Sequence, residues 1–321
     1  MLDRPIGILD EHPEWSRRLI EALDARRLPY EKIDHSSHAL DPSDREPHYA
    51  VLINRTSPSS HTRGHGGVLF YAEAILAHYE ALGVPVINPV RAYRFEKSKA
   101  LQLGLFERLG VRYPRAVVVN HREQVLKVLD RIAFPLVVKP NVGGSGAGIV
   151  RFDSADALRG GLDALDFGPD GTALVQEYVE PAEGAIVRVE VLDGQALYAI
   201  RIVRENAQGF NLCPADICQV PAPPAAVDAL GACPVDVRPG LSVSRVEAPR
   251  DAVETAIRLT RGAGIDVGGV EYLVGARDGA TYFYDVNATS NFVADAPRVL
   301  GFDPYPAFVD FIVARAQKGT V

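Results

Sequence analysis

The 321-residue sequence lacks long uncharged apolar stretches and contains few cysteines. No window reaches the roughly 18–20 apolar residues that a membrane-spanning helix requires. The N-terminus MLDRPIGILDEH lacks the basic and apolar regions of a secretory signal. Cys213, Cys218 and Cys233 are odd in number and form no CxxC motif, so we expect neither a disulfide framework nor a four-cysteine zinc site. These absences predict a cytoplasmic protein with reduced thiols and no membrane partner.

The charge balance of the chain is acidic. Lys and Arg number 34 and Asp and Glu 41, which gives a formal net charge of −7. Such a chain is a poor binder of phosphate backbones, so no nucleic acid partner is expected. Hydrophobic residues make up 47% of the sequence, which excludes wholesale disorder. The length suits two or three domains.

The first 90 residues show alternating strand and helix patterns. Short apolar runs predict strands at residues 6–9, 30–33 and 50–53, and apolar residues at helical spacing predict helices at 15–26 and 69–82. Alternating strands and helices are typical of a doubly wound α/β unit. We therefore expect an α/β domain at the N-terminus.

The rest of the chain is richer in strands. Apolar residues at helical spacing predict a helix at residues 97–109, which Gly110 would terminate. The segments GGVEYLV and ATYFYDVN are expected to form a β-hairpin. Prolines recur between residues 220 and 249, which predicts an irregular excursion or a lid. Further helices are expected at 252–261 and 305–316.

A glycine loop, GGSGAG at residues 143–148, joins two predicted strands. Glycines allow backbone N–H groups to approach phosphate oxygens closely. The loop lacks the GK[ST] sequence and the following helix of a Walker A motif, so a flap over a nucleotide is the better interpretation. Lys139 lies four residues before the loop, where a buried ammonium group needs an anionic partner. A simple glycine hairpin with a lysine that reaches the surface is the alternative.

Oxygen-bearing side chains gather near the end of the predicted hairpin. Glu271, Asp285 and Asn287 are flanked by apolar residues and are of the ligand types that suit Mg²⁺. The alternative is that the two carboxylates cap a solvent-facing sheet.

The strand register makes the metal hypothesis specific. Residues opposite each other in a hairpin share one face, so Glu271 must pair with Asp285 or Asn287. A two-residue turn at residues 278–279 would instead pair Glu271 with Val286, unless a bulge intervened.

Taken in order, these segments resemble the ATP-grasp superfamily, in particular RimK-type glutamate ligases and glutathione-synthetase-like ligases. The resemblance covers residues 97–291 through KALQLGLFERLGVRYP, FPLVVKPNVGGSGAGI, LVQEYVEPAEG, AIVRVEVL, GGVEYLV and YFYDVNATSN. It implies an ATP-grasp fold, with two α+β lobes at residues 96–180 and 181–321 that grip ATP, preceded by an α/β domain at 1–95.

The resemblance also implies roles for individual residues. Two lysines and the glycine flap would contact the phosphates, a linker would hold the adenine, and two arginines would lie near the transferred phosphate. The usual acidic ribose ligand is replaced by Ile186, so Glu183 or Glu180 is expected to substitute. The implied nucleotide-binding residues are Lys99, Lys139, Gly143, Gly144, Ser145, Gly146, Gln176, Glu177, Tyr178, Val179 and Glu183; the catalytic residues are Arg188 and Arg201; the metal ligands are Glu271, Asp285 and Asn287.

The implied reaction is ATP-dependent ligation of a carboxylate to an amine through an acyl phosphate, releasing ADP and phosphate. ATP and two Mg²⁺ ions, or Mn²⁺, are the implied cofactors; the substrates would be an amino acid, a peptide or a similar small molecule, and a homo-oligomer is compatible with the resemblance. A small-molecule kinase and a non-catalytic nucleotide-binding regulator are the alternatives. The negative net charge argues against a kinase for polyanions.

Substrate contacts are expected from loops at the ends of strands. Arg55 follows a predicted strand of the first domain, where α/β sheets bind ligands, and it suits a carboxylate. Ser290 and Asn291 follow the expected metal-binding strand. His61 and His65 have no acidic companions nearby in the sequence, so we expect a polar loop and not a metal site.

Overall fold

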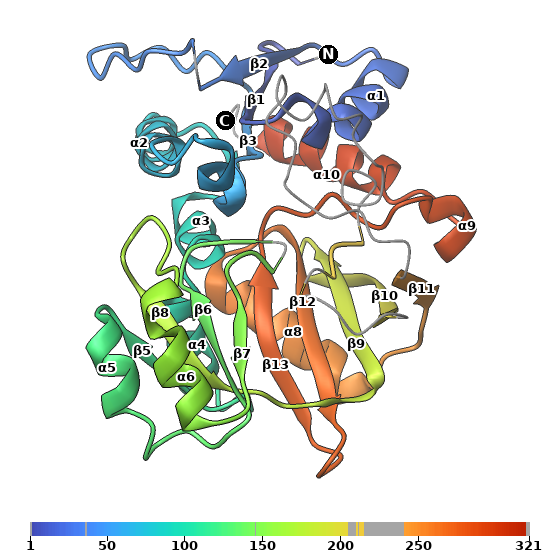
Figure 1. The fold of residues 1–321 in the computed structure, drawn as a ribbon. Helices are drawn as coiled ribbons and strands as arrows, with labels where there is room; N and C mark the ends of the chain where they lie inside the picture. Colours follow the sequence, from blue (N-terminus) through green and yellow to red (C-terminus); the bar gives the residue numbers. More distant parts are fainter. Residues whose placement is uncertain are drawn as a thin grey trace, which may run out of the picture.

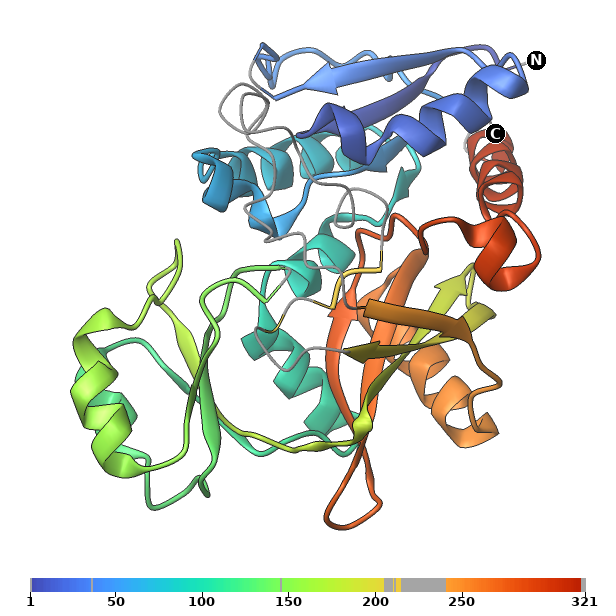
Figure 2. The same ribbon diagram turned by 45° about the vertical axis from the view of Figure 1, so that its right-hand side comes forward.

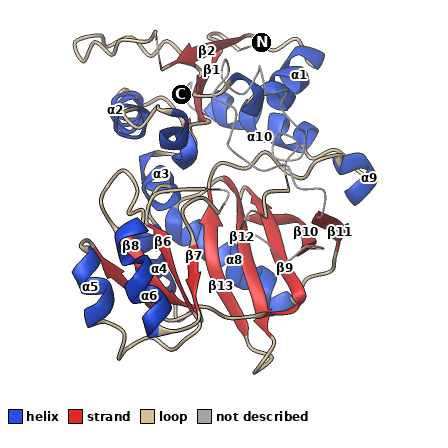
Figure 3. Cartoon of the chain, viewed as in Figure 1, coloured by secondary structure: helices blue, strands red, loops and turns tan. Residues whose placement is uncertain are grey.

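The computed structural model describes residues 2–35, 37–144, 146–204, 210, 212–214 and 241–318. Figure 1 shows a parallel sheet with its helices above two antiparallel sheets, and Figure 3 shows the same arrangement by element type. The mixed α/β architecture predicted from the sequence is confirmed. No helix among the described residues combines the length and apolar character needed to cross a membrane.

The first sheet contains four parallel strands in the order β2-β1-β3-β4. Its strands are β1 (Ile6–Asp10), β2 (Tyr30–Asp34), β3 (Val51–Asn54) and β4 (Val86–Ile87). Its helices are α1 (Arg17–Ala25), α2 (Val68–Ala81) and α3 (Val90–Glu96), with 3₁₀ turns η1 (Pro13–Trp15) and η2 (Pro58–Arg63). The doubly wound pattern predicts most of these elements, but α3 and the 3₁₀ turns are additional.

The C-terminal helix returns to this first unit. Helix α10 (Tyr305–Lys318) lies beside α1 (Figure 2), and its Phe308 and Ile312 share one apolar core with Leu19 and Leu23 of α1. The sequence-based boundary at residue 181 assigns this helix to the C-terminal lobe. Its apolar residues share one core both with the first sheet and with Ile186, Ile200 and Val267 of the C-terminal lobe, a long-range contact that local periodicity does not reveal.

The second sheet contains four antiparallel strands in the order β5-β8-β6-β7. They are β5 (Ala116–Val119), β6 (Leu136–Pro140), β7 (Val150–Phe152) and β8 (Ala173–Glu177). Helices α5 (Arg122–Lys127) and α6 (Ala155–Gly161) pack on it, followed by η3 (Leu162–Ala164). The glycine loop joins the paired strands β6 and β7, as predicted.

The third sheet contains five antiparallel strands in the order β11-β10-β9-β12-β13. They are β9 (Pro181–Leu192), β10 (Gln195–Arg204), β11 (Leu241–Arg245), β12 (Val267–Gly275) and β13 (Thr281–Asn287). Helices α4 (Lys99–Arg108) and α8 (Arg250–Ala263) cover one face, and α9 (Ala296–Leu300) precedes α10. Most of the proline-rich segment lies outside the described residues, but its end forms β11, a strand where we expected irregular structure.

Candidate functional site

A cavity of about 170 Å³ lies where the three sheets meet. Its wall combines the glycine flap, residues of β6, β9, β12 and β13, the end of α3, the start of α4, and the loops that follow β1 and β3. The lining residues are Trp15, Ser57, Pro58, Ser59, Glu96, Lys99, Lys139, Pro140, Gly143, Gly144, Gly146, Ala147, Ile149, Arg188, Phe210, Leu212, Cys213, Glu271, Tyr284, Asp285 and Asn287.

The register of β12 and β13 brings the three expected metal ligands to one face. Glu271 is opposite Asp285, and Gly269 is opposite Asn287. The register shifts between Glu271 and Tyr272, so a bulge restores the pairing that a short turn alone would disrupt. Of the two pairings predicted for Glu271, the one with Asp285 is confirmed, and the one with Asn287 is not formed.

The charges around these ligands are only partly balanced by the protein. Burial raises the pKa of Glu271, whereas the Arg188 guanidinium opposes this shift; Arg188 Nη1 lies 3.0 Å from Glu271 Oε1. Lys99 Nζ lies 3.3 Å from Asp285 Oδ1. The buried Nδ2 of Asn287 has no hydrogen-bond partner among the described residues.

The donor set itself is compatible with a divalent cation. Across the described parts of the chain, no three acidic, histidine or cysteine side chains gather in a metal-binding group. Two carboxylates and one amide oxygen remain as hard ligands, and Mg²⁺ commonly completes its shell with water and substrate phosphates. The residues therefore fit such an ion.

Two lysines form a cationic wall of the cavity. Lys139 ends β6 and is only 6% exposed; burial, together with the neighbouring Lys99, lowers the pKa of Lys139 to about 8. Lys99 Nζ lies 3.5 Å from the carbonyl oxygen of Gly143, in the flap. Two ammonium groups in the wall of one cavity favour an anionic ligand between them.

The glycine flap lies over the same cavity. Gly143, Gly144 and Gly146 line it, whereas Ser145 lies outside the described residues. Gly146 has φ of 72°, a left-handed conformation that favours glycine. A Cβ atom on Gly144 would lie 3.7 Å from the Cβ of Ser59, so the flap approaches the first domain closely.

Arg188 is held in the wall by two carboxylates. Its Nε lies 2.6 Å from Glu190 Oε1, and its Nη1 donates to Glu271. Burial alone would lower the pKa of Arg188, but Glu190 and Glu271 keep it above its ordinary value. Gly269 leaves space for this guanidinium, because a Cβ atom there would overlap it.

Arg201 lies away from Arg188, contrary to our expectation. Ile200 is opposite Arg188 and Arg201 is opposite Val187, so the two arginines project from opposite faces of the sheet. Arg201 Nη2 contacts Glu183 Oε2 at 2.6 Å, and neither residue lines the cavity. Strand alternation thus separates Arg201 and Glu183 from the face that carries Arg188, Glu271 and Asp285.

The expected adenine linker, Gln176, Glu177, Tyr178 and Val179, spans the end of β8 and the following residues. Gln176 Nε2 donates to the carbonyl of Pro114 at 3.2 Å. The backbone N–H groups of Glu177 and Tyr178 donate to other main-chain carbonyls. The linker does not line the described cavity.

The three expected substrate residues contact one another. Arg55 is 3% exposed; its Nη1 donates to the Ser290 carbonyl at 2.7 Å, and its Nη2 donates to the Trp15 carbonyl and the Asn291 side chain. Because a buried guanidinium needs acceptors, these contacts hold Arg55 inside the protein. It joins the first domain to the segment after β13 and does not line the cavity.

Several lining residues were missed from the sequence. Glu96 at the end of α3 accepts the N–H of Ala288, and burial raises the pKa of Glu96 to about 7. Glu190, which does not line the cavity but holds Arg188, was recognisable only as a carboxylate in an apolar strand. Ser57 and Ser59 follow β3, so the strand-end rule that selected Arg55 could have found them.

Cys213 also lines the cavity and is disulfide-bonded. The expectation of three reduced thiols was therefore wrong for this residue, because sequence spacing does not report which sulfur atoms the fold brings together. Cys218 and Cys233 lie outside the described residues.

Comparisons with known proteins agree with this geometry. Residues 96–212 match the RimK-like ATP-grasp domain family. A probable alpha-L-glutamate ligase of Aliivibrio salmonicida is 25% identical over 329 residues, covering 98% of this chain and 97% of that protein. One from Parasynechococcus marenigrum is 27% identical over 285 residues, covering 84% of this chain. The chain spans only 53% of the length of that second relative.

Solved structures share the fold over nearly the whole chain. The ATP-grasp ligase PsnB in complex with a minimal precursor superposes with a TM-score of 0.68 at 19% identity, covering 98% of this chain and 100% of PsnB. D-alanine–D-alanine ligase from Bacillus anthracis with ATP gives 0.64 at 17% identity, covering 98% and 97%. Residues 96–212 thus match the RimK-like ATP-grasp domain family, and the chain has the fold of ATP-grasp ligases.

Proposed function

We propose that this enzyme joins a carboxylate to an amine through an acyl phosphate, releasing ADP and phosphate. One observation carries the proposal: Glu271, Asp285 and Asn287 share a cavity with Lys99, Lys139 and the glycine flap. The carboxylates on one side of the cavity suit metal ions, and the lysines on the other side suit the phosphates of a triphosphate. The relatives named glutamate ligases and the peptide-bound PsnB structures support an amino acid or a peptide as substrate.

Glu271, Asp285 and Asn287 are the residues that would hold Mg²⁺, and we propose two ions. The metal would neutralise charge on the triphosphate and orient it. Lys99 already contacts Asp285, and Arg188 already contacts Glu271. They therefore lie where they can pass from a protein carboxylate to a phosphate oxygen when the nucleotide enters.

The main electrostatic problem is the approach of a carboxylate to a polyanion. At an effective dielectric constant near 20, two unit charges 4 Å apart interact by about 4 kcal/mol. Lys99, Lys139 and Arg188 offset this repulsion from the cavity wall. Because Glu190 fixes the Nε edge of Arg188 at 2.6 Å, the guanidinium is oriented before substrate binds.

The flap has a protective role in this proposal. An acyl phosphate must be kept from water until the amine attacks, and a closed loop excludes water. Gly143, Gly144 and Gly146 already lie over the cavity. The three units would divide the work: residues 1–95 with α10 for substrate, 96–180 for nucleotide, and 181 to the end of α9 for metal.

Product analysis tests the proposal. The protein is incubated with ATP, Mg²⁺ and mixed amino acids, and the products are separated. We expect equal amounts of ADP, free phosphate and an amide. A phosphorylated acceptor without free phosphate, or release of AMP and pyrophosphate, would contradict the acyl-phosphate route.

A further inference from the structure

A group of polar side chains from the first domain forms one wall of the same cavity. Trp15, Ser57 and Ser59 line it, and they follow β1 and β3 at the carboxyl ends of these parallel strands. Such strand ends are where open α/β sheets bind ligands. None of the three has a role in holding phosphate or metal in the proposed reaction.

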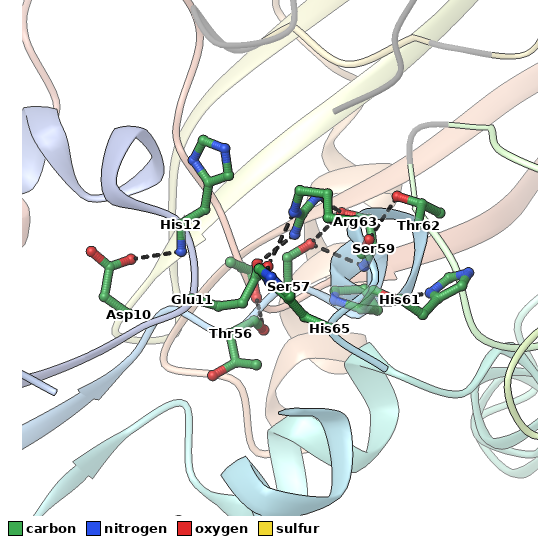
Figure 4. Close-up of polar contacts among 12 residues, drawn as sticks. Asp10, Glu11, His12, Thr56, Ser57, Ser59, His61, Thr62, Arg63 and His65 are labelled. Atoms are coloured by element: carbon green, nitrogen blue, oxygen red, sulfur yellow. Dashed lines mark hydrogen bonds and ion pairs between the residues drawn. The ribbon is translucent and has the colours of Figure 1, made fainter. Parts of the chain in front are cut away.

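A buried ion pair between Glu11 and Arg63 supports this wall, because Arg63 contacts both Trp15 and Ser59. The side chains of Glu11 and Arg63 are each 1% exposed. Arg63 donates from Nε to Glu11 Oε1 at 3.0 Å and from Nη2 to Glu11 Oε2, and its guanidinium lies 4.9 Å from the centre of the Trp15 ring. A fork held by both carboxylate oxygens has little rotational freedom. Its remaining terminal nitrogen, Nη1, is thereby directed to Ser59 Oγ at 3.0 Å (Figure 4).

The hydrogen atoms of the two serine hydroxyls can be counted. Ser57 Oγ and Ser59 Oγ lie 2.8 Å apart, and Ser57 Oγ also accepts the backbone N–H of Ser59. Each hydroxyl has one hydrogen and two acceptor sites, and only one hydrogen is used between them. One O–H therefore remains, whichever serine donates to the other. Within the described residues, neither hydroxyl donates a hydrogen bond to any acceptor other than the neighbouring serine.

We infer that Ser57 and Ser59, positioned by Arg63 and Glu11, bind a carboxylate group of a substrate. A hydroxyl that accepts from a guanidinium is polarised toward donation, so its partner is an acceptor. A carboxylate is the anionic acceptor that amino acids and peptides carry, and the nearby Lys99 and Lys139 favour an anion in this cavity. The inference rests on the proposed function, because it requires substrate and nucleotide to share the cavity.

The carboxylate has two possible origins. It is either the far end of the acid substrate or the carboxylate of an amino acid that supplies the amine.

Intrinsic fluorescence reports on this wall of the cavity, because Trp15 is the sole tryptophan of the sequence. The protein with ADP and Mg²⁺ is titrated with glutarate and with glycine, each beside its amide, glutaramide or glycinamide. We expect a saturable change with one acid and at least tenfold weaker binding of its amide. A response to glutarate would show that the two serines bind the carboxylate of the acid substrate. A response to glycine would show that they bind the carboxylate of the amine substrate.

Matched serine variants complete the test. Ser59→Ala removes the hydroxyl that accepts from Arg63, whereas Ser60→Ala alters a buried serine of the same turn that does not line the cavity. We expect at least tenfold weaker carboxylate binding for S59A and no change for S60A; S57A serves if S59A does not fold. Equal effects of S59A and S60A, or no response to either acid, would overturn this subsite. Failure of the wild type to bind ADP in calorimetry would instead count against the proposed function.

Discussion

Glu271 and Asp285 face each other across the β12–β13 ladder because a bulge follows Glu271. Without this bulge, Glu271 and Asp285 would lie on opposite faces of the sheet, and one of the two carboxylates would point toward α4 and α8. Removing one of them should therefore affect chemistry more than folding. Asp285→Asn keeps the shape of the side chain but removes its charge, and we expect turnover to fall by on the order of 10²–10³-fold.

The measurement for D285N is the rate of phosphate release at saturating ATP, together with thermal unfolding. Asp156→Asn is the control, because the side chain of Asp156 is 95% exposed on α6. Turnover of D285N close to that of D156N would remove Asp285 from the metal site.

Gly269→Ala tests the placement of Arg188. The added Cβ would overlap the guanidinium, and the flanking carboxylates leave it no equivalent position. We expect kcat to fall at least tenfold, about 1.4 kcal/mol in the activation barrier. Gly104→Ala in α4, where a Cβ atom meets nothing within 4 Å, should leave kcat unchanged. Equal kcat values for G269A and G104A would show that Arg188 does not need its present position.

Lys139 makes nucleotide binding depend on pH. Its pKa is lowered to about 8, so the free protein loses this positive charge as the pH rises through that value. Bound phosphate favours the charged form. ADP binding at about pH 8 should therefore take up a proton, and affinity should fall at higher pH.

Calorimetry at this pH in two buffers of different ionisation enthalpy measures the proton uptake directly. Lys139→Met should abolish it and weaken ADP binding. Binding heats that do not depend on the buffer in the wild type would contradict the role of Lys139.

Arg55 should contribute to stability and not to substrate affinity. Arg55→Lys loses the forked contacts with Ser290 and Asn291, and we expect the free energy of unfolding to fall by about 2–3 kcal/mol. Urea unfolding measures the loss, with Arg277→Lys as the control because the Arg277 side chain is 87% exposed. Unchanged stability with a strongly raised KM for the acid substrate would restore Arg55 as a substrate ligand.

The parts of the site that were predicted depend on local pattern. The strand–glycine–strand sequence places the flap after Lys139, and period-two alternation with a bulge brings Glu271 opposite Asp285. These relationships lie within one hairpin or one loop, so the sequence contains the information needed to infer them.

The parts that were missed depend on contacts between distant segments. Arg201 was expected beside Arg188, but the β9–β10 register, which includes a shift between Ala196 and Tyr198, puts it on the other face. Two of the three acceptors of Arg55, on Ser290 and Asn291, lie more than 230 residues away in sequence. Neither the partner of a buried arginine nor the register of long strands is encoded in a short motif.

The central claim is that the glycine flap and the β12–β13 carboxylates close on one triphosphate. A crystal structure with Mn²⁺ and a non-hydrolysable ATP analogue tests it most directly. We predict phosphate density between Lys139 and Asp285, with anomalous signal from Mn²⁺ beside Glu271, Asp285 and Asn287. Nucleotide bound in another cavity, or manganese bound away from these three residues, would contradict the account.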